Sequence, residues 1–347
     1  MPDPTRIDAP ALAARLSQRL TEAGAAVPSA EAATQAMMHA SRLGVDSHGA
    51  RLAEFYCTML RDGRVNPRPS VTVRRTALAA AIVDGDDGLG HLTAYRAMAE
   101  AIGMARETGI AAAGALRSSH FGAAGAYALH AAEAGLVGIS TTNADSLVTL
   151  FGGSRPFHGT NPIAVAAPVA GAKPWLLDMA TSAIPFNRVL LYRSLGVTLP
   201  PGTAADAEGS ETRRAEDATM LMPLGGTDFG FKGAALAGVA TLLSAVLLGM
   251  ALDHDLDFEA AGPGSGKPPN LGHFFIAIDP KRFAGEAAFA RGMRRYLDAL
   301  RAVAPRMADE GAGVMAPGDR EWRVEAERMS AGIPIDPDTA RFLGFSE

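Results

Sequence analysis

The chain has 347 residues, a formal net charge of −5, 48% hydrophobic and 20% charged residues, and a single cysteine. This length and composition are those of a globular protein of two or three domains rather than of a disordered chain. The acidic balance argues against a nucleic-acid binder, because no basic surplus is present to neutralise phosphates. The lone Cys57 excludes an intrachain disulfide and any cysteine-rich metal site. We therefore expect a reducing, cytoplasmic setting, and the first five residues show no targeting signal.

The first part of the chain is predicted to be helical. Alanine-rich segments give helices over residues 8–20, 29–43 and 52–61. Between the second and third of these helices lies a glycine-flanked turn, residues 44–51, which presents Asp46, Ser47, His48 and Arg51. A histidine in such a turn can pass a proton in either direction near neutral pH. His48 is therefore a candidate catalytic residue, and the alternative is an ordinary hydrogen-bonded loop histidine.

Strands and helices alternate irregularly over the rest of the chain, which predicts a mixed α+β fold whose sheet need not be parallel. A glycine run at residues 84–91 follows a strand and imitates a dinucleotide fingerprint. Thr93 occupies the third glycine position, and the neighbouring aspartates would repel a pyrophosphate, so no Rossmann domain is expected. The predicted strands are two within residues 71–84, then 111–116, 137–142, 163–169, 175–177 and 274–278, and the helices are 93–108, 123–134 and 283–303.

Polar and glycine-rich clusters end several of these elements between residues 117 and 182. His120 follows two serines and precedes Phe121 and a glycine, which makes it a second candidate for proton transfer. The turn at residues 159–162 is held rigid by its glycine and by Pro162. A further strand ends in Asp178, where backbone N–H groups beside a carboxylate suit a ribose hydroxyl and a phosphate. Each cluster alone is also compatible with an ordinary turn.

Neither a metal site nor a membrane span is expected. No two of the eight histidines have the i, i+4 spacing with a nearby acid that marks a zinc site. Residues 233–252 carry no charge and are long enough to cross a bilayer. Their many glycines and alanines, the absence of an aromatic belt, and charges at both ends favour the buried central helix of a soluble protein.

Seven short motifs occur in an order that points to a known family. The chain resembles the malate/L-lactate dehydrogenase family of the second type, which includes ureidoglycolate, sulfolactate and diketogulonate oxidoreductases and a cyclic-imine reductase. The match covers nearly the whole chain. The motifs are residues 46–49, 119–122, 151–153, 159–162, 178–182, 223–226 with 231–233, and 317–318.

The resemblance implies an oxidoreductase that uses NAD or NADP and forms a homodimer. It also implies a large, mainly antiparallel sheet domain and a helical domain made from both chain ends. We therefore expect residues 1–75 with 283–347 to form the helical domain, and residues 76–282 to form a cofactor and substrate domain, whole or divided in two. The expected substrate is a small 2-hydroxy acid or the corresponding 2-keto acid.

The same resemblance suggests roles for individual residues. Removal of hydride from C2 of a hydroxy acid requires the hydroxyl proton to leave, and a neutral imidazole can accept it. The family credits one or the other of two histidines, here His48 and His120, with this role. A guanidinium can hold the substrate carboxylate with two parallel bonds, and Arg51 is the nearest candidate. Ser47 and Asp145 are further expected catalytic residues, with Asp145 orienting His120 or selecting an amino or imino substrate. The expected cofactor residues are Thr160, Asp178, Met179, Ala180, Lys232, Gly233, Gly318 and Asp319.

Three positions depart from the family pattern. Some relatives place the arginine one position later, where this chain has Leu52. An acid is usual about nine residues after Lys232, where this chain has Thr241, and an aliphatic residue is usual at the position of His158. Two alternatives therefore stay open: a reductase of a cyclic imine or diketo acid, and a ligand-binding dimer without catalysis.

Overall fold

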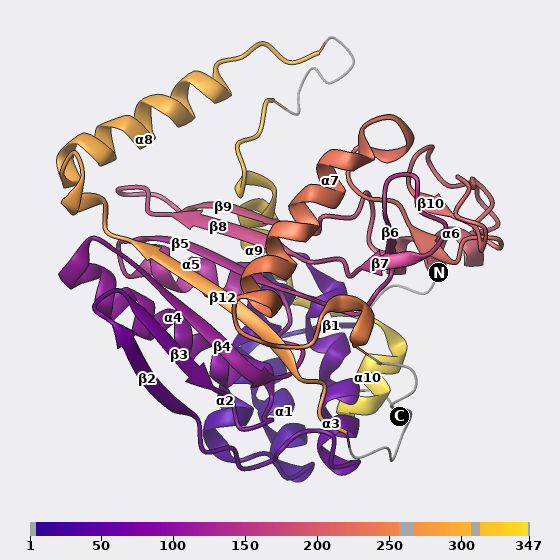
Figure 1. Ribbon diagram of the computed structural model, residues 1–347, viewed down its shortest axis with the longest axis horizontal. Helices are drawn as coiled ribbons and strands as arrows, with labels where there is room; N and C mark the ends of the chain where they lie inside the picture. Colours follow the sequence, from indigo (N-terminus) through magenta and orange to yellow (C-terminus); the bar gives the residue numbers. More distant parts are fainter. Residues whose placement is uncertain (1–4, 257–266, 307–312, 346–347) are drawn as a thin grey trace.

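The computed structural model describes residues 5–256, 267–306 and 313–345, and its centre is a seven-stranded sheet. Figure 1 shows this sheet running through the middle of the molecule. All neighbouring strands are antiparallel except β3 and β4, so the expected α+β fold with a large, mainly antiparallel sheet is confirmed. In spatial order the strands are β2 (Thr72–Ala77), β3 (Ala80–Asp84), β4 (Ile110–Ser118), β12 (Leu271–Ile278), β5 (Val137–Thr142), β8 (Ile163–Ala167) and β9 (Trp175–Met179).

Helices cover both faces of the sheet at close range. Helices α4 (Gly90–Thr108) and α5 (Gly125–Glu133) pack on one face, and α7 (Gly226–Thr241) with its π-helical continuation Leu242–Val246 packs on the other. Small residues allow this approach: a Cβ on Gly138 would lie 2.5 Å from the Ala128 carbonyl oxygen, and one on Gly114 would lie 2.2 Å from Leu248. The alanine-rich strands and helices therefore form a thin, densely packed core.

Both ends of the chain contribute to a second, helical core. Leu12, Leu16 and Leu20 recur at i, i+4 spacing and are fully buried on one face of the first helix. Strand β1 (Thr5–Ile7) pairs antiparallel with β13 (Ile333–Ile335) and ties the two chain ends together. The helices that share this core are α1 (Ala9–Glu22), α2 (Val27–Arg42), α3 (Ala53–Arg61) and α10 (Pro337–Leu343).

Helix α7 differs from the buried helix that the sequence predicts. Its side toward the sheet is buried at Ala237 and Ala240, but Val239 and Leu242 on the opposite side are 46% and 54% exposed. The stretch Gly226–Val246 is long and apolar enough to cross a membrane by length and composition. In its most apolar segment of 18 residues, 39% is buried inside the structure. The prediction of burial is wrong for one face, because composition alone does not tell which sides of an apolar helix the chain itself covers.

Several elements surround this framework. Helix α8 (Glu286–Arg301) extends away from the sheet (Figure 1) and buries only Leu297 among its residues. Helix α9 (Asp319–Ala331) returns the chain to α2. Sequence patterns did not predict a small sheet and one helix at the other end of the molecule. These are β10 (Ala204–Ala205), β11 (Met220–Leu221), β6 (Val148–Thr149) and β7 (Pro156–His158), in that spatial order, and α6 (Phe186–Leu195).

Candidate active site

Two histidine rings from separate elements stack against each other. His48 ends the short 3₁₀ turn Asp46–His48, and His120 follows the last residues of β4. Their ring centroids are 5.8 Å apart with an interplanar angle of 25°. Each ring has its Nδ1 occupied, because His120 Nδ1 lies 2.8 Å from the Tyr56 hydroxyl and His48 Nδ1 lies 2.9 Å from the Ser47 hydroxyl. The Nε2 atoms are therefore the nitrogens available to a bound molecule.

The surroundings keep both imidazoles neutral. Burial lowers the pKa of His48 below its usual value, and burial lowers the pKa of His120 well below it, with further contributions from His48, His91 and His273. A neutral imidazole can accept a proton, whereas a protonated one can only donate. The pair is therefore suited to accept a proton at neutral pH.

The turn that carries His48 is anchored from the far end of the chain. Arg328 in α9 donates to both carboxylate oxygens of Asp46, at 2.5 and 2.9 Å, and to the Ser41 carbonyl oxygen at 2.5 Å. The Ser41 hydroxyl accepts a hydrogen bond from the Ala50 backbone N–H. A Cβ on Gly49 would lie 2.3 Å from that hydroxyl, so only glycine permits this close turn.

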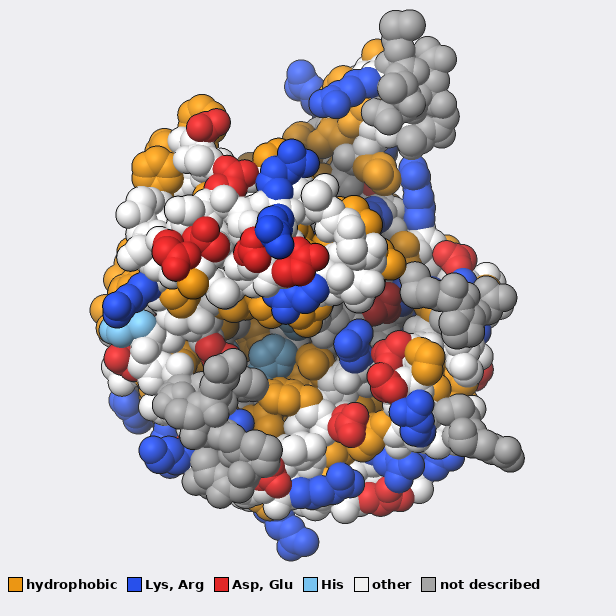
Figure 2. Space-filling view, turned by 90° about the vertical axis from the view of Figure 1, so that its right-hand side faces the viewer, with side chains coloured by type: hydrophobic (Ala, Val, Ile, Leu, Met, Phe, Trp, Pro, Cys, Tyr) orange, Lys and Arg blue, Asp and Glu red, His pale blue; other side chains and the backbone are white. Residues whose placement is uncertain are grey.

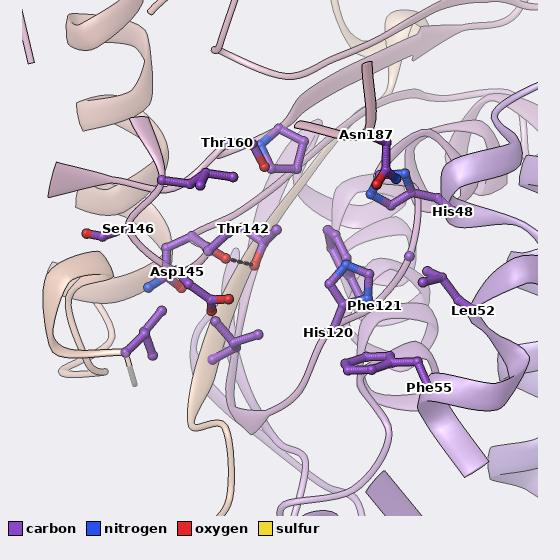
Figure 3. Close-up of a pocket in the computed structure, with 17 residues that line it drawn as sticks. His48, Leu52, Phe55, His120, Phe121, Thr142, Asp145, Ser146, Thr160 and Asn187 are labelled. Carbon is purple, nitrogen blue, oxygen red and sulfur yellow. Dashed lines mark hydrogen bonds between the residues drawn. The ribbon is translucent and has the colours of Figure 1, made fainter. Parts of the chain in front are cut away.

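The histidine pair forms one wall of a cavity of about 670 Å³. Figure 3 shows His48 and His120 on one side, with Leu52 and Phe55 beside them, and Asp145 across the space. Figure 2 shows a hollow in the molecular surface, with a histidine surrounded by hydrophobic side chains. The remaining polar residues of the wall include Thr142, Asn143, Ser146, Thr160 and Asn187.

Asp145 is the acid that lines this cavity. Burial raises its pKa to about 6, and the lowering effects of its own backbone N–H and of Arg64 do not cancel that shift. Asp253 acts in the same direction as burial. The carboxyl group therefore changes its charge close to physiological pH, which is typical of functional sites as well as of some structural acids.

A buried network holds the turn at residues 159–162. One carboxylate oxygen of Asp253 accepts hydrogen bonds from Asn161 Nδ2 at 2.7 Å, from the Thr241 hydroxyl at 2.8 Å and from the Gly159 N–H at 3.2 Å. His158 Nδ1 lies 3.0 Å from the same oxygen. Asn161 has a positive φ of 31°, a conformation that these bonds maintain. The network thereby positions Thr160, which lines the cavity.

Two further cavities continue the first. The second, of about 330 Å³, shares His48, Thr160 and Asn187 with the first and is also lined by Ser47, Asp178, Met179 and Ala180. The third, of about 350 Å³, shares Asp178 with the second and reaches Gly318. The three spaces therefore adjoin one another, from the histidine pair, past Asp178, to the start of α9.

Asp178 lies where the second and third cavities meet. Asp178 accepts a hydrogen bond from the Gly125 N–H at 2.9 Å, and a Cβ on Gly125 would lie 2.7 Å from the same carboxylate oxygen. Burial raises the pKa of Asp178 to about 6, while the Gly125 N–H acts in the opposite direction. A partly buried acceptor beside small residues such as Ala123 and Ala180 suits a ribose hydroxyl next to a flat ring.

Four residues expected at the site lie outside these cavities. Arg51 is exposed, and its charge acts on Asp336 of the C-terminal segment. Lys232 lies over the rings of Phe229 and Phe231, at 5.1 and 5.9 Å from their centroids. The other two are Gly233, which packs against the Leu224 backbone, and Asp319, which forms an ion pair with Arg301.

The structure also adds residues to the site to which the sequence patterns gave no role. Leu52 and Tyr56 are four positions apart, which is about one helical turn. The helix predicted to begin at residue 52 would therefore place both side chains on the same face. Asn187 lies in the first turn of helix α6, which was not predicted, and Asp253 lies 92 positions from its partner Asn161. No pattern in the neighbouring sequence therefore indicates that either residue belongs to the site. Among the residues that the structure describes, no group of three or more His, Cys, Asp or Glu side chains could hold a metal ion.

Comparisons with known proteins agree with one another. The family model for malate/L-lactate dehydrogenase matches residues 7–343. The chain is 36% identical over 322 residues to a malate dehydrogenase of Pyrococcus horikoshii, covering 91% of this chain and 87% of that protein. It is 30% identical over 328 residues to an NAD(+)-dependent ureidoglycolate dehydrogenase of Escherichia coli O157:H7, covering 94% and 92%. The crystal structure of a delta1-piperideine-2-carboxylate reductase from Pseudomonas syringae pvar. tomato superimposes with a TM-score of 0.86 at 29% identity, covering 99% of this chain and 100% of that chain.

Proposed function

The chain belongs to the malate/L-lactate dehydrogenase family and is an NAD(P)-dependent oxidoreductase of 2-hydroxy acids, and on that premise we propose that His120 transfers the substrate proton. The observation that carries this proposal is the neutral, stacked histidine pair at the wall of the large cavity. His120 is favoured over His48 because its Nδ1 partner is the fully buried Tyr56 ring, whereas His48 is bonded to the neighbouring Ser47. A fixed ring presents its Nε2 in one direction.

The chain's own residues divide the work of the reaction. The cofactor, when bound, takes up or supplies the hydride. We assign Asp178, Met179, Ala180 and Thr160 to hold it near the histidines, and Gly318 to border its far end, because these residues line the two adjoining cavities. His120 Nε2 accepts the hydroxyl proton during oxidation and returns it during reduction. His48, with Ser47 on its Nδ1, donates or accepts the second hydrogen bond to the reacting group.

Paired substitutions test this assignment. His120→Asn keeps a polar side chain but removes the base, and we expect kcat/KM for a 2-hydroxy acid to fall by a factor of about 10² to 10⁴. His48→Asn should cost less than His120→Asn. Full turnover in both variants would show that neither ring carries the proton. Binding of NADH, followed by its fluorescence, should persist in both variants and serves as the control for folding.

A second candidate function is the reduction of a cyclic imine. The observation that favours it is Asp145, an acid with a pKa raised to about 6 on the wall opposite His120 (Figure 3), since such a group can donate a proton to an imine nitrogen. Assays in both directions with a cyclic 2-imino acid and a 2-keto acid separate the two functions. A keto acid reduced faster than the imine supports the dehydrogenase.

We also propose a homodimer in which the exposed face of α7 packs against a second copy. Leu236, Val239, Leu242 and Val246 recur at helical spacing and are 40–56% exposed, which makes a continuous apolar stripe. We propose an interface rather than a bilayer, since Asp228 and Lys232 lie within the same helix. Light scattering of the wild type and of Val239→Asp tests this, because a stable dimer in both would contradict it.

The wider setting follows from composition. The net charge of −5 supports small-molecule rather than nucleic-acid partners, and the single, buried Cys57 is compatible with a cytoplasmic location. We further propose that residues 1–75 with 283–347 form one domain and residues 76–282 the other, supported by the shared core of the two chain ends. Limited proteolysis should release fragments near these boundaries.

A further inference from the structure

The walls of the large cavity are mostly apolar beyond the histidine pair. Leu52 and Phe55 stand beside His120 (Figure 3), and three leucines complete the lining at other positions. Leu52 and Phe55 follow the turn of His48 directly, so the same anchored segment places both the imidazole and the apolar wall. The three leucines are Leu147, Leu256 and Leu271.

No lysine or arginine is among the described residues that line this cavity. Arg51 is exposed and does not line the cavity, and its charge contributes to lowering the pKa of Asp336. Arg64 is buried near enough to Asp145 to lower its pKa, but it is not a lining residue. Residues 257–266, which lie outside the described ranges, contain no lysine or arginine in their sequence.

A second anionic group on a substrate would be costly in such a space. A carboxylate that leaves water needs a cation or several hydrogen-bond donors. The lining offers a few neutral donors, among them Ser146, Thr160 and Asn187, which are enough for one carboxylate. The remaining charged group is Asp145, which repels an anion when it is ionised.

We propose that the substrate is a 2-hydroxy acid with a single carboxylate and an uncharged, apolar chain, and that the cavity excludes acids carrying a second anionic group. The inference rests on the proposed function, since it concerns the substrate of the same site. The neutral donors hold the one carboxylate, and the leucine and phenylalanine side chains contact the chain beyond C2.

Matched substrates test the proposal. 2-Hydroxypentanoate and 2-hydroxypentanedioate have the same backbone length and differ in the second carboxylate. We expect kcat/KM to favour the monocarboxylate by at least about tenfold with either cofactor, because the second carboxylate is desolvated without a cation. Heat unfolding without cofactor gives a readout independent of turnover: the monocarboxylate should raise the midpoint and the dicarboxylate should not.

Two variants sharpen the test. Leu52→Arg places a cation in the wall and should move the preference toward the dicarboxylate by at least about tenfold, whereas Leu52→Met, which preserves size and lacks charge, should keep the wild-type preference. A wild-type preference for the dicarboxylate in both turnover and heat protection would overturn the inference. If the wild type turned over neither acid nor any other 2-hydroxy or 2-keto acid, the proposed function itself would fall, and the inference with it.

Discussion

Arg328 holds Asp46 with both terminal nitrogens of its guanidinium, although the two residues are 282 positions apart in the chain. The same side chain donates to the Ser41 carbonyl oxygen, so α9, α2 and the turn of His48 meet at one group. Arg328 is 9% exposed, whereas the Asp46 side chain is 56% exposed, so the contact joins a buried guanidinium to a carboxylate at the surface. The position of a catalytic candidate therefore depends on the last part of the chain.

Removal of this contact should weaken both stability and catalysis. In Arg328→Met, Asp46 loses its partner, and we expect the free energy of unfolding to fall by about 1–2 kcal/mol, because the exposed carboxylate is solvated again while the buried Ser41 carbonyl oxygen loses a donor. Displacement of His48 should also lower kcat. Urea unfolding and steady-state assays measure the two effects. Arg341→Met is the matched control, because its pair with Asp338 is exposed and should contribute less than about 1 kcal/mol.

The hydrogen bond between His120 Nδ1 and the Tyr56 hydroxyl should matter for rate more than for stability, because a proton held on Nδ1 leaves Nε2 free to accept one. Tyr56→Phe removes one hydroxyl from a buried ring and leaves the packing of the ring intact. We expect kcat to fall by about tenfold, the equivalent of about 1.4 kcal/mol, while NADH affinity stays unchanged. Unchanged kcat in Tyr56→Phe would show that the hydroxyl does not orient the imidazole.

The pH dependence of oxidation should reflect the lowered pKa of His120. Its burial keeps the neutral, proton-accepting form dominant well below the usual histidine range. We therefore expect the acid limb of log kcat/KM for oxidation to lie below pH 6.5. A limb at or above pH 7 would contradict the assignment of this ring as the base.

Folding stability should fall on acidification because three fully enclosed histidines resist protonation. Burial lowers the pKa values of His39, His91 and His273 to about 3, so the unfolded chain binds their protons first. Their contribution is complete above pH 6.5 and is lost as the pH falls toward about 3. Asp145 and Asp178, whose pKa values are raised to about 6, have the opposite effect. Between the ordinary pKa of an aspartate and pH 6 the folded protein binds more protons at these groups than the unfolded chain, so acidification in that range favours folding.

A variant isolates one of these histidines. Both ring nitrogens of His91 are buried without a hydrogen-bond partner among the described residues. In His91→Leu the loss of stability between pH 7 and pH 4 should be smaller than in the wild type, as followed by the midpoint of thermal unfolding. An identical slope in both proteins would show that burial does not lower the pKa of His91 in the folded protein.

The Asp253 network should hold the turn of Thr160 in place. Asp253→Ala leaves Asn161, Thr241 and His158 without their common acceptor, and we expect a loss of about 2–4 kcal/mol in unfolding free energy. A raised KM should accompany it, because Thr160 lines two of the cavities. Asp255→Ala is the control, as that side chain is 58% exposed. Equal stability of the two variants would remove any structural role for the network.

Local turn chemistry explains why much of the candidate site could be predicted from sequence. The turns of His48 and His120 each follow a recognisable element, and the strand ending at Asp178 is a clear hydrophobic run, so all three were expected near one another and the structure brings them together. Asn187 and Asp253 were not predicted, because their positions depend on tertiary contacts that leave no pattern in neighbouring residues. Arg51 was chosen for its closeness to His48 in sequence, yet the 3₁₀ turns Asp46–His48 and Ala50–Leu52 place Leu52, not Arg51, at the cavity.

The pairing of β1 with β13 has a consequence during synthesis of the chain. Strand β1 leaves the ribosome long before its partner, because nearly all of the described chain lies between the two strands in the sequence. The large sheet has all its strands once Ile278 has been synthesised. The helical core is complete only after β13 and α10 have been synthesised as well. A truncation of only the final fifteen residues would thus strip the partner of β1 and the Leu343 side of that core, while leaving every strand of the central sheet in the product.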